Sequence, residues 1–198
     1  MGIKKTLVFF HFIVFLLELG RISNAQRPGN RRCPTGCVCF VTTVRCMHLR
    51  LDSIPRVPVE TRILDMRFNR IRSIPSSTFH RMWNLNTLLL NNNEIQSISE
   101  DAFRGLSSLK YLYLHDNKLV TVPSGTFATL PKLERLLLHA NLIETLPNRL
   151  FDHLTSLKRL RLDGNRLRCD CDLSWLATFL KGPGRKIFAA AICHHPRT

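Results

Sequence analysis

Seven cysteines and eight histidines are the residues of this 198-residue chain whose types and spacing could do chemistry. Four cysteines lie close together near the start, three lie near the end, and none falls between residues 46 and 169. Such clusters form either disulfides or a tetrahedral zinc site, and spacing alone leaves both open. The cysteines are Cys33, Cys37, Cys39, Cys46, Cys169, Cys171 and Cys193.

The segment 1–25 bears on this choice, because it has the layout of a secretory signal peptide. Lys4 and Lys5 form a positive start, a nearly continuous apolar run extends from Leu7 to Leu17, and small residues precede Gln26. The alternative is a membrane anchor, but spanning a bilayer takes about 20 apolar residues. We therefore expect a secreted product with no membrane span, in a compartment that favours disulfides over zinc.

The histidines could act as metal ligands or as general bases. No Ser-His-Asp arrangement can be placed on them, and the chain has no glycine-rich phosphate loop. His115 and His139 occupy equivalent places in a repeat, and a metal site would need a third ligand, for which Asp116 and Asp163 are the nearby residues. We expect two exposed histidines on a binding face, and we predict no catalytic residue, no metal site and no cofactor.

The charge of the chain favours anionic partners. The formal net charge is +15, and loss of the segment 1–25 would remove three cations and one anion, leaving +13. A secreted, strongly basic protein attracts sulfated glycans such as heparin, acidic matrix proteins and anionic cell surfaces. Nucleic acid, the usual partner of a basic protein inside a cell, is not expected for a secreted protein.

A repeat positions these residues. An asparagine recurs at a constant interval within the frame L-x-L-x-x-N-x-L, which is typical of the leucine-rich repeat. Each L-x-L stretch predicts a short strand that pairs in parallel with the next coil, about 4.8 Å away. We therefore predict an α/β solenoid, curved, with its parallel strands on the concave face. The asparagines, whose numbers differ by 24 at each step, are Asn69, Asn93, Asn117, Asn141 and Asn165.

The frame residues have structural roles. A buried asparagine in each coil can bond backbone groups where the chain leaves the strand, and an unsatisfied buried amide would cost about 1–3 kcal/mol. A second column, of phenylalanines with the same period as the asparagines, predicts an aromatic spine in the core rather than a cofactor-binding box. Its members are Phe79, Phe103, Phe127 and Phe151.

The open ends of a solenoid must be closed by terminal units with a polar outer face. Here both ends are cysteine-rich, and at the back Asp172 could cap a short helix whose apolar face covers the last coil. We predict a signal peptide (1–25), a basic linker (26–32), an N-terminal cap (33–60), five repeats (61–168) and a C-terminal cap (169–198).

The variable strand positions form the candidate binding face. Tyrosine and leucine at the centre would give an exposed apolar anchor, and the cations around it suit an acidic protein or a sulfated glycan. The alternative is a solvated charged face with no partner. The candidate residues are Leu89, Tyr111, Tyr113 and Leu137 at the centre, with Arg135, Lys158, Arg159 and Arg161 around them.

Residues 33–46 and 168–193 resemble the cysteine-rich flanks of extracellular leucine-rich repeat proteins. The resemblance implies that cysteines pair first with third and second with fourth within each flank. That gives Cys33–Cys39, Cys37–Cys46 and Cys169–Cys193, and it leaves Cys171 unpaired because a fourth cysteine is missing at the back. We therefore expect a truncated sequence or a short isoform, in which Cys171 could link two chains as a dimer.

A narrower resemblance, to the repeat domain of the peroxidasin family, rests on CFVTTVRCMHL (39–49), ILDMRFNRIR (63–72), LNTLLLNNN (85–93) and LKRLRLDGNRLRCDC (157–171). It implies a protein of the extracellular matrix whose longer relatives carry immunoglobulin-like domains and a haem peroxidase that cross-links collagen IV. Two functions follow as expectations. The chain is a secreted binding module, or it is the N-terminal part of a peroxidasin-like enzyme whose catalytic domain is absent from this sequence.

Overall fold

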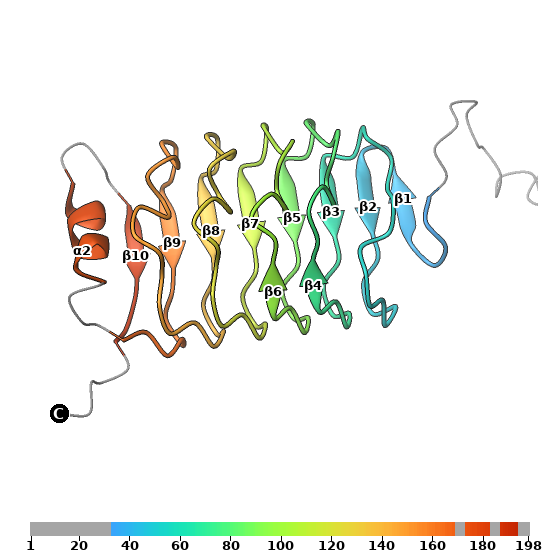
Figure 1. The fold of residues 1–198 in the computed structure, drawn as a ribbon. Coiled ribbons are helices and arrows are strands. Elements are labelled where there is room, and N and C mark those ends of the chain that lie inside the picture. Colours follow the sequence, from blue (N-terminus) through green and yellow to red (C-terminus); the bar gives the residue numbers. More distant parts are fainter. Residues whose placement is uncertain (1–32, 169–172, 183–186, 194–198) are drawn as a thin grey trace, which may run out of the picture. The chain divides into compact units, whose positions relative to one another are not determined.

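The computed structural model describes residues 33–168, 173–182 and 187–193 (Figure 1). The predicted signal peptide and basic linker, Cys169, Cys171 and Asp172 lie outside these residues. No helix in the described part of the chain has the length and hydropathy needed to cross a bilayer.

One eight-stranded sheet runs the length of the solenoid in the order β1-β2-β3-β5-β7-β8-β9-β10 (Figure 1). β1 and β2 pair antiparallel, and every later pair in this sheet is parallel. The solenoid of parallel strands is therefore confirmed. The strands are β1 (Val38–Phe40), β2 (Thr43–Arg45), β3 (Ile63–Asp65), β5 (Thr87–Leu89), β7 (Tyr111–Tyr113), β8 (Arg135–Leu137), β9 (Arg159–Arg161) and β10 (Phe188–Ala190).

The repeat period sets the register of the sheet. From β3 to β9 each residue pairs with its equivalent in the next repeat, as Leu88 pairs with Leu112. The central leucine of each of these strands points inward and is fully buried. Its two neighbours point to the opposite side, because side chains alternate along a strand. We call this outward side the sheet face.

The frame asparagines satisfy the backbone where each coil turns. The Asn93 side-chain amide donates to the carbonyl of Leu90 in its own coil and to that of Met66 in the preceding coil. Its oxygen accepts from the Ile71 backbone N–H. Asn117 and Asn141 repeat the pattern, and all five asparagines are buried. Their predicted structural role is confirmed.

The phenylalanine spine is also confirmed. Phe79, Phe103, Phe127 and Phe151 are fully buried, and successive ring centroids lie 5.9, 6.2 and 6.1 Å apart.

Helix α2 (Ser174–Lys181) covers the end of this spine. Its Trp175 and Phe179 rings lie 5.9 and 5.8 Å from the Phe151 ring. Leu173 occupies the N-cap position of α2 and makes no side-chain cap hydrogen bond, and Gly182 occupies the C-cap position. The expected helix over the last coil is therefore present.

A second, two-stranded sheet pairs β4 (Ser73–Ile74) with β6 (Ser97–Ile98) on the other side of the coils (Figure 1). The Ser99 N–H donates to the Ile74 carbonyl at its end. The equivalent residue of the next coil is Pro123, which has no N–H to donate. That missing donor explains why this sheet gains no third strand in the described residues.

Two disulfides hold the N-terminal cap, Cys33–Cys39 and Cys37–Cys46, which is the pairing that the family resemblance implies. Cys46 is fully buried at the start of the core. At the other end Cys193 is also disulfide-bonded. The predicted pairing of Cys169 with Cys193, and the predicted free thiol of Cys171, involve residues outside those described.

Candidate functional site

The candidate binding residues lie in register on the sheet face. One column runs from Thr87 through Tyr111 and Arg135 to Arg159, and a second runs parallel to it. The repeat therefore brings residues one period apart in sequence to the spacing of neighbouring strands, about 4.8 Å. Lys158 lies just before β9, and the second column consists of Leu89, Tyr113, Leu137 and Arg161.

The centre of this face is a cluster of Tyr111, Tyr113 and Arg135. The Arg135 guanidinium lies 5.7 Å from the centroid of the Tyr111 ring, and it donates a hydrogen bond of 3.2 Å to the Tyr113 hydroxyl. No carboxylate in the described residues lies within ion-pair distance of Arg135. The cluster therefore presents a positive charge that is held against the Tyr111 ring and hydrogen-bonded to the Tyr113 hydroxyl.

A groove of about 540 Å³ opens over this cluster. The central residues are partly buried, so the prediction that they are exposed is wrong. Side chains of adjacent coils shield one another laterally because the strands lie so close. Three lining residues, Arg67, Thr87 and Asn91, were not among the residues predicted for the binding face, although each occupies a variable column. The groove is lined by Arg67, Thr87, Leu89, Asn91, Tyr111, Tyr113, His115 and Arg135.

Two side chains that belong to the variable columns are buried. Asn91 is 6% exposed, and its amide donates to the Asn92 side chain. Asp65 is 3% exposed and accepts two hydrogen bonds from the Arg67 guanidinium. This ion pair raises the pKa of Arg67, with the hydrogen bond to Asp65 as the largest cause. In the first coil, the positive charge of Arg67 in the groove is therefore neutralised by Asp65.

The predicted basic residues differ in how much charge they leave free. Glu134 lies between Lys110 and Lys158, at 3.3 and 2.7 Å from their amino groups. The hydrogen bond from Lys158 is the largest cause of the lowered pKa of Glu134, and the same bond raises the pKa of Lys158. The charge of Lys158 is therefore partly compensated by a neighbour in its own column.

Arg161 and Arg159 show the same contrast. The Arg161 guanidinium binds both carboxylate oxygens of Asp163, which raises the pKa of Arg161 and lowers that of Asp163. Arg159 instead lies over the Phe188 ring, 5.1 Å from its centroid. In the described residues no carboxylate lies within ion-pair distance of Arg159. Arg135 and Arg159 thus carry the uncompensated positive charge of the predicted set.

His115 and His139 lie beside the groove as a stacked pair, with ring centroids 4.4 Å apart and planes within 9° of parallel. The prediction that both are exposed is wrong, since both are partly buried and the His115 side chain is only 18% exposed. Burial is the largest cause of the lowered pKa of each imidazole. Asp116 lies beside His115, with 3.9 Å between its carboxylate and Nε2.

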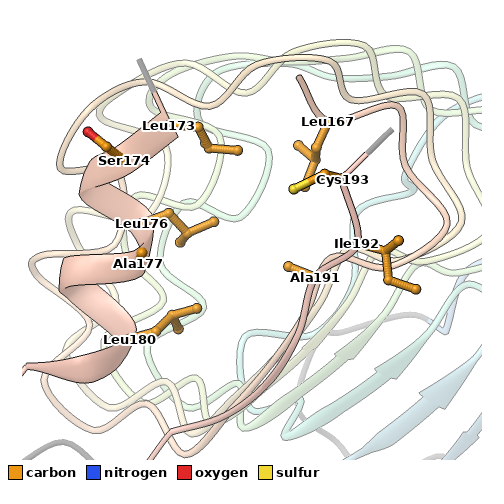
Figure 2. Close-up of a pocket in the computed structure, with 9 residues that line it drawn as sticks. All are labelled: Leu167, Leu173, Ser174, Leu176, Ala177, Leu180, Ala191, Ile192 and Cys193. Atoms are coloured by element: carbon orange, nitrogen blue, oxygen red, sulfur yellow. The ribbon is translucent and has the colours of Figure 1, made fainter. Parts of the chain in front are cut away.

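A separate cavity of about 340 Å³ lies in the C-terminal cap, between α2 and the residues after β10 (Figure 2). Leu173, Leu176 and Leu180 point into it from the helix side, and Leu167 lies opposite them. None of the described residues that line it carries a charge. The cavity is therefore suited to an apolar group.

Comparison with known proteins places the fold in a family. The family model described as leucine rich repeat matches residues 60–119 and 107–167, which together exceed half of the chain. The chain belongs to the leucine-rich repeat family. Among solved structures, a TLR13–ssRNA13 complex matches with a TM-score of 0.65 and 29% identity, over 71% of this chain and 21% of that one.

Among its relatives, this leucine-rich repeat chain is 67% identical over 60 residues to a probable oxidoreductase, PXDNL, of Homo sapiens. It is 62% identical over 68 residues to the human peroxidasin homolog, and 38% identical over 60 residues to asporin of Bos taurus. These matches cover 30%, 34% and 30% of this chain. They cover only 4%, 4% and 16% of the relatives, so the resemblance concerns a small part of each.

Proposed function

We propose that this chain is a secreted leucine-rich repeat module of the extracellular matrix or cell surface, which binds a protein partner through the groove on the sheet face. The observation that carries the proposal is the cluster of Tyr111, Tyr113 and Arg135. Tyrosine and arginine are the residue types that contribute most to binding when they are held in a pocket. Here the arginine is held by the Tyr111 ring and the Tyr113 hydroxyl before any partner arrives.

The chemistry of the groove indicates an acidic partner. An aromatic and aliphatic floor receives an apolar side chain, and Arg135 can bind a carboxylate or sulfate in two-point geometry. Arg159 continues the positive column toward β10. A sulfated glycan offers the same anionic groups without the apolar side chain, so it would use the arginines and neglect Leu89 and the tyrosines.

The test uses immobilised basement-membrane extract and immobilised heparin as two separate probes. Tyr111→Ser with Tyr113→Ser should lower retention on the extract at least tenfold and leave retention on heparin nearly unchanged. Val120→Ser is the matched control, because Val120 is 46% exposed and lies outside the groove. If the wild type is not retained on the extract, the proposal is contradicted. It is also contradicted if the tyrosine variant is retained as strongly as the wild type.

A second candidate is favoured by the identities of 67% and 62% to the peroxidasin-type relatives. In this proposal the chain is the repeat segment of a longer peroxidasin-like protein, and the haem peroxidase lies in another part of that protein. Sequencing the transcript beyond the codon for Thr198 tests it. An open frame that encodes immunoglobulin-like and peroxidase domains supports this candidate, whereas an immediate stop codon in every transcript contradicts it.

A further inference from the structure

Three potential metal ligands from two adjoining coils lie together at the edge of the sheet face. His115, Asp116 and His139 each offer one ligand atom, and these atoms all lie within 4.8 Å of one another. Their backbones are held by the fold, because the Asp116 N–H donates to the His139 carbonyl at 3.2 Å. Asp116 has a φ of 53°, a left-handed conformation that the turn after the strand shares with Phe68, Asn92 and other equivalent residues.

The two imidazoles are under-used as hydrogen-bonding groups. Nδ1 of His115 and Nδ1 of His139 are both buried and have no hydrogen-bond partner. A buried polar atom without a partner costs free energy, and where it recurs in a structure it calls for an explanation. Stacked rings also disfavour protonation of both at once, which leaves their nitrogens available as lone-pair donors.

We propose that His115, His139 and Asp116 bind one divalent transition-metal ion of the Zn²⁺ class. Imidazole nitrogen and carboxylate oxygen are ligands that Zn²⁺ accepts, at about 2.0–2.2 Å in tetrahedral geometry. Two nitrogens on a tetrahedral zinc are about 3.4 Å apart, which follows from those bond lengths. The ligand atoms start within 4.8 Å of one another, and one imidazole must turn out of the stack so that both nitrogen lone pairs point at the same ion.

The surrounding charges limit the affinity without excluding the ion. Arg67 and Arg161 act on the imidazoles as repelling cations, and Asp116 and Asp163 act as attracting anions. Each arginine is itself paired with an aspartate, Arg67 with Asp65 and Arg161 with Asp163. The pairing reduces the net repulsion, and Asp116 supplies the negative charge closest to His115. Water or a partner group would complete the fourth position on the open side.

The alternative is a stacked pair of neutral histidines with no ligand. That alternative accounts for the stacking, but it gives no role to Asp116, whose carboxylate lies 3.9 Å from Nε2 of His115. The lowered pKa of each imidazole favours the neutral form, which is the form that a metal requires. The proposal does not depend on the groove's protein partner, so either can fail alone.

The experiment is a calorimetric titration of the purified full chain with ZnCl₂ at pH 7.4, after alkylation so that no thiol competes. The wild type should bind one ion. His115→Gln and His139→Gln should each weaken binding at least tenfold, and Asp116→Asn should weaken it less. The matched controls are His80→Gln and His153→Gln, since both side chains are exposed and neither belongs to the cluster of His115, Asp116 and His139. A third control, His194→Gln with His195→Gln, tests the two histidines near the end of the sequence.

A spectroscopic arm separates binding from loss of fold. Co²⁺ in place of Zn²⁺ should give visible absorption bands of tetrahedral intensity in the wild type and in the controls, and weaker bands in His115→Gln. Each variant should keep the wild-type far-ultraviolet circular dichroism. Absence of binding in the folded wild type, or equal binding in the folded His115→Gln/His139→Gln double variant, would overturn the proposal.

Discussion

The interior and the sheet face of this solenoid are built from alternate residues of the same strands, and they obey different rules. Inside, the same residue type returns once in every repeat, so each leucine, asparagine and phenylalanine meets its own kind in the next coil. Outside, the equivalent column holds Thr87, Tyr111, Arg135 and Arg159 in succession. The interior gives stability that is nearly independent of what the face carries, and the face is free to acquire binding chemistry.

The largest effect should come from breaking the aromatic spine. Phe127 lies between Phe103 and Phe151, and Phe127→Ala should lower the free energy of unfolding by about 3–5 kcal/mol because a cavity remains in the core. Urea denaturation followed by circular dichroism measures it. Tyr111→Ala on the face is the control and should cost far less. Equal losses for the two variants would erase the distinction between interior and face.

The next largest loss of stability should come from opening the N-terminal cap, which covers the core at the first coil. Cys37→Ser with Cys46→Ser removes the buried disulfide of the N-terminal cap and should cost about 2–4 kcal/mol. A chelator should leave the thermal midpoint unchanged in metal-free buffer, because the cap is held by sulfur bonds and not by a metal. Thermal unfolding with and without reductant and chelator measures both effects. Unfolding by the chelator alone would contradict this prediction.

The third largest loss of stability should come from removing one of the five buried frame asparagines, which we call the asparagine ladder. In Asn117→Ala the carbonyls of Leu90 and Leu114 and the N–H of Ile95 lose a buried partner. The expected loss is about 2 kcal/mol or more, because unsatisfied buried groups cost about 1–3 kcal/mol each. The control is Asn86→Ala on the sheet face, which should cost less than about 0.5 kcal/mol. A loss as small in Asn117→Ala as in the control would show that the ladder is dispensable.

The smallest effect is a pH dependence carried by the stacked histidines. Burial lowers the folded-state pKa of His115 and His139 below the ordinary value of 6.5. The unfolded chain therefore takes up protons first as the pH falls below 6.5, and the folded state loses stability until the lowered pKa is reached. Thermal midpoints between pH 8 and pH 5 should decline less in a His115→Gln/His139→Gln variant. An identical decline in both proteins would assign the effect to other groups.

The interior could be predicted from the sequence, because a fixed period encodes it directly. The constant spacing of the asparagines and phenylalanines was enough to place the ladder and the spine. For the sheet face, the sequence predicted only which residues share a column, and not how far each side chain is buried. Nothing in the sequence around Asn91 or Asp65 shows that these side chains are buried, since burial depends on which way each side chain turns. The spacing of Glu134 and Lys158, one period apart, could have revealed their ion pair.

The C-terminal end was harder to predict for a different reason. The helix was expected from its apolar spacing, but the extra strand β10 was not, because its residues FAA carry no frame leucine. Its pairing with β9 comes from backbone hydrogen bonds, such as the one from the Leu162 N–H to the Ala190 carbonyl. Backbone pairing of this kind leaves no mark on side-chain periodicity.

The most direct test of the account changes the face of one coil and leaves its interior intact. A variant with serine at Lys110, Tyr111, Tyr113 and His115 keeps every frame residue of that coil. We predict a thermal midpoint within about 3 °C of the wild type, which corresponds to roughly 1 kcal/mol for a chain of this size, together with loss of retention on basement-membrane extract. A midpoint lowered as far as in Asn117→Ala, or full retention on the extract, would contradict the division between a stabilising interior and a binding face.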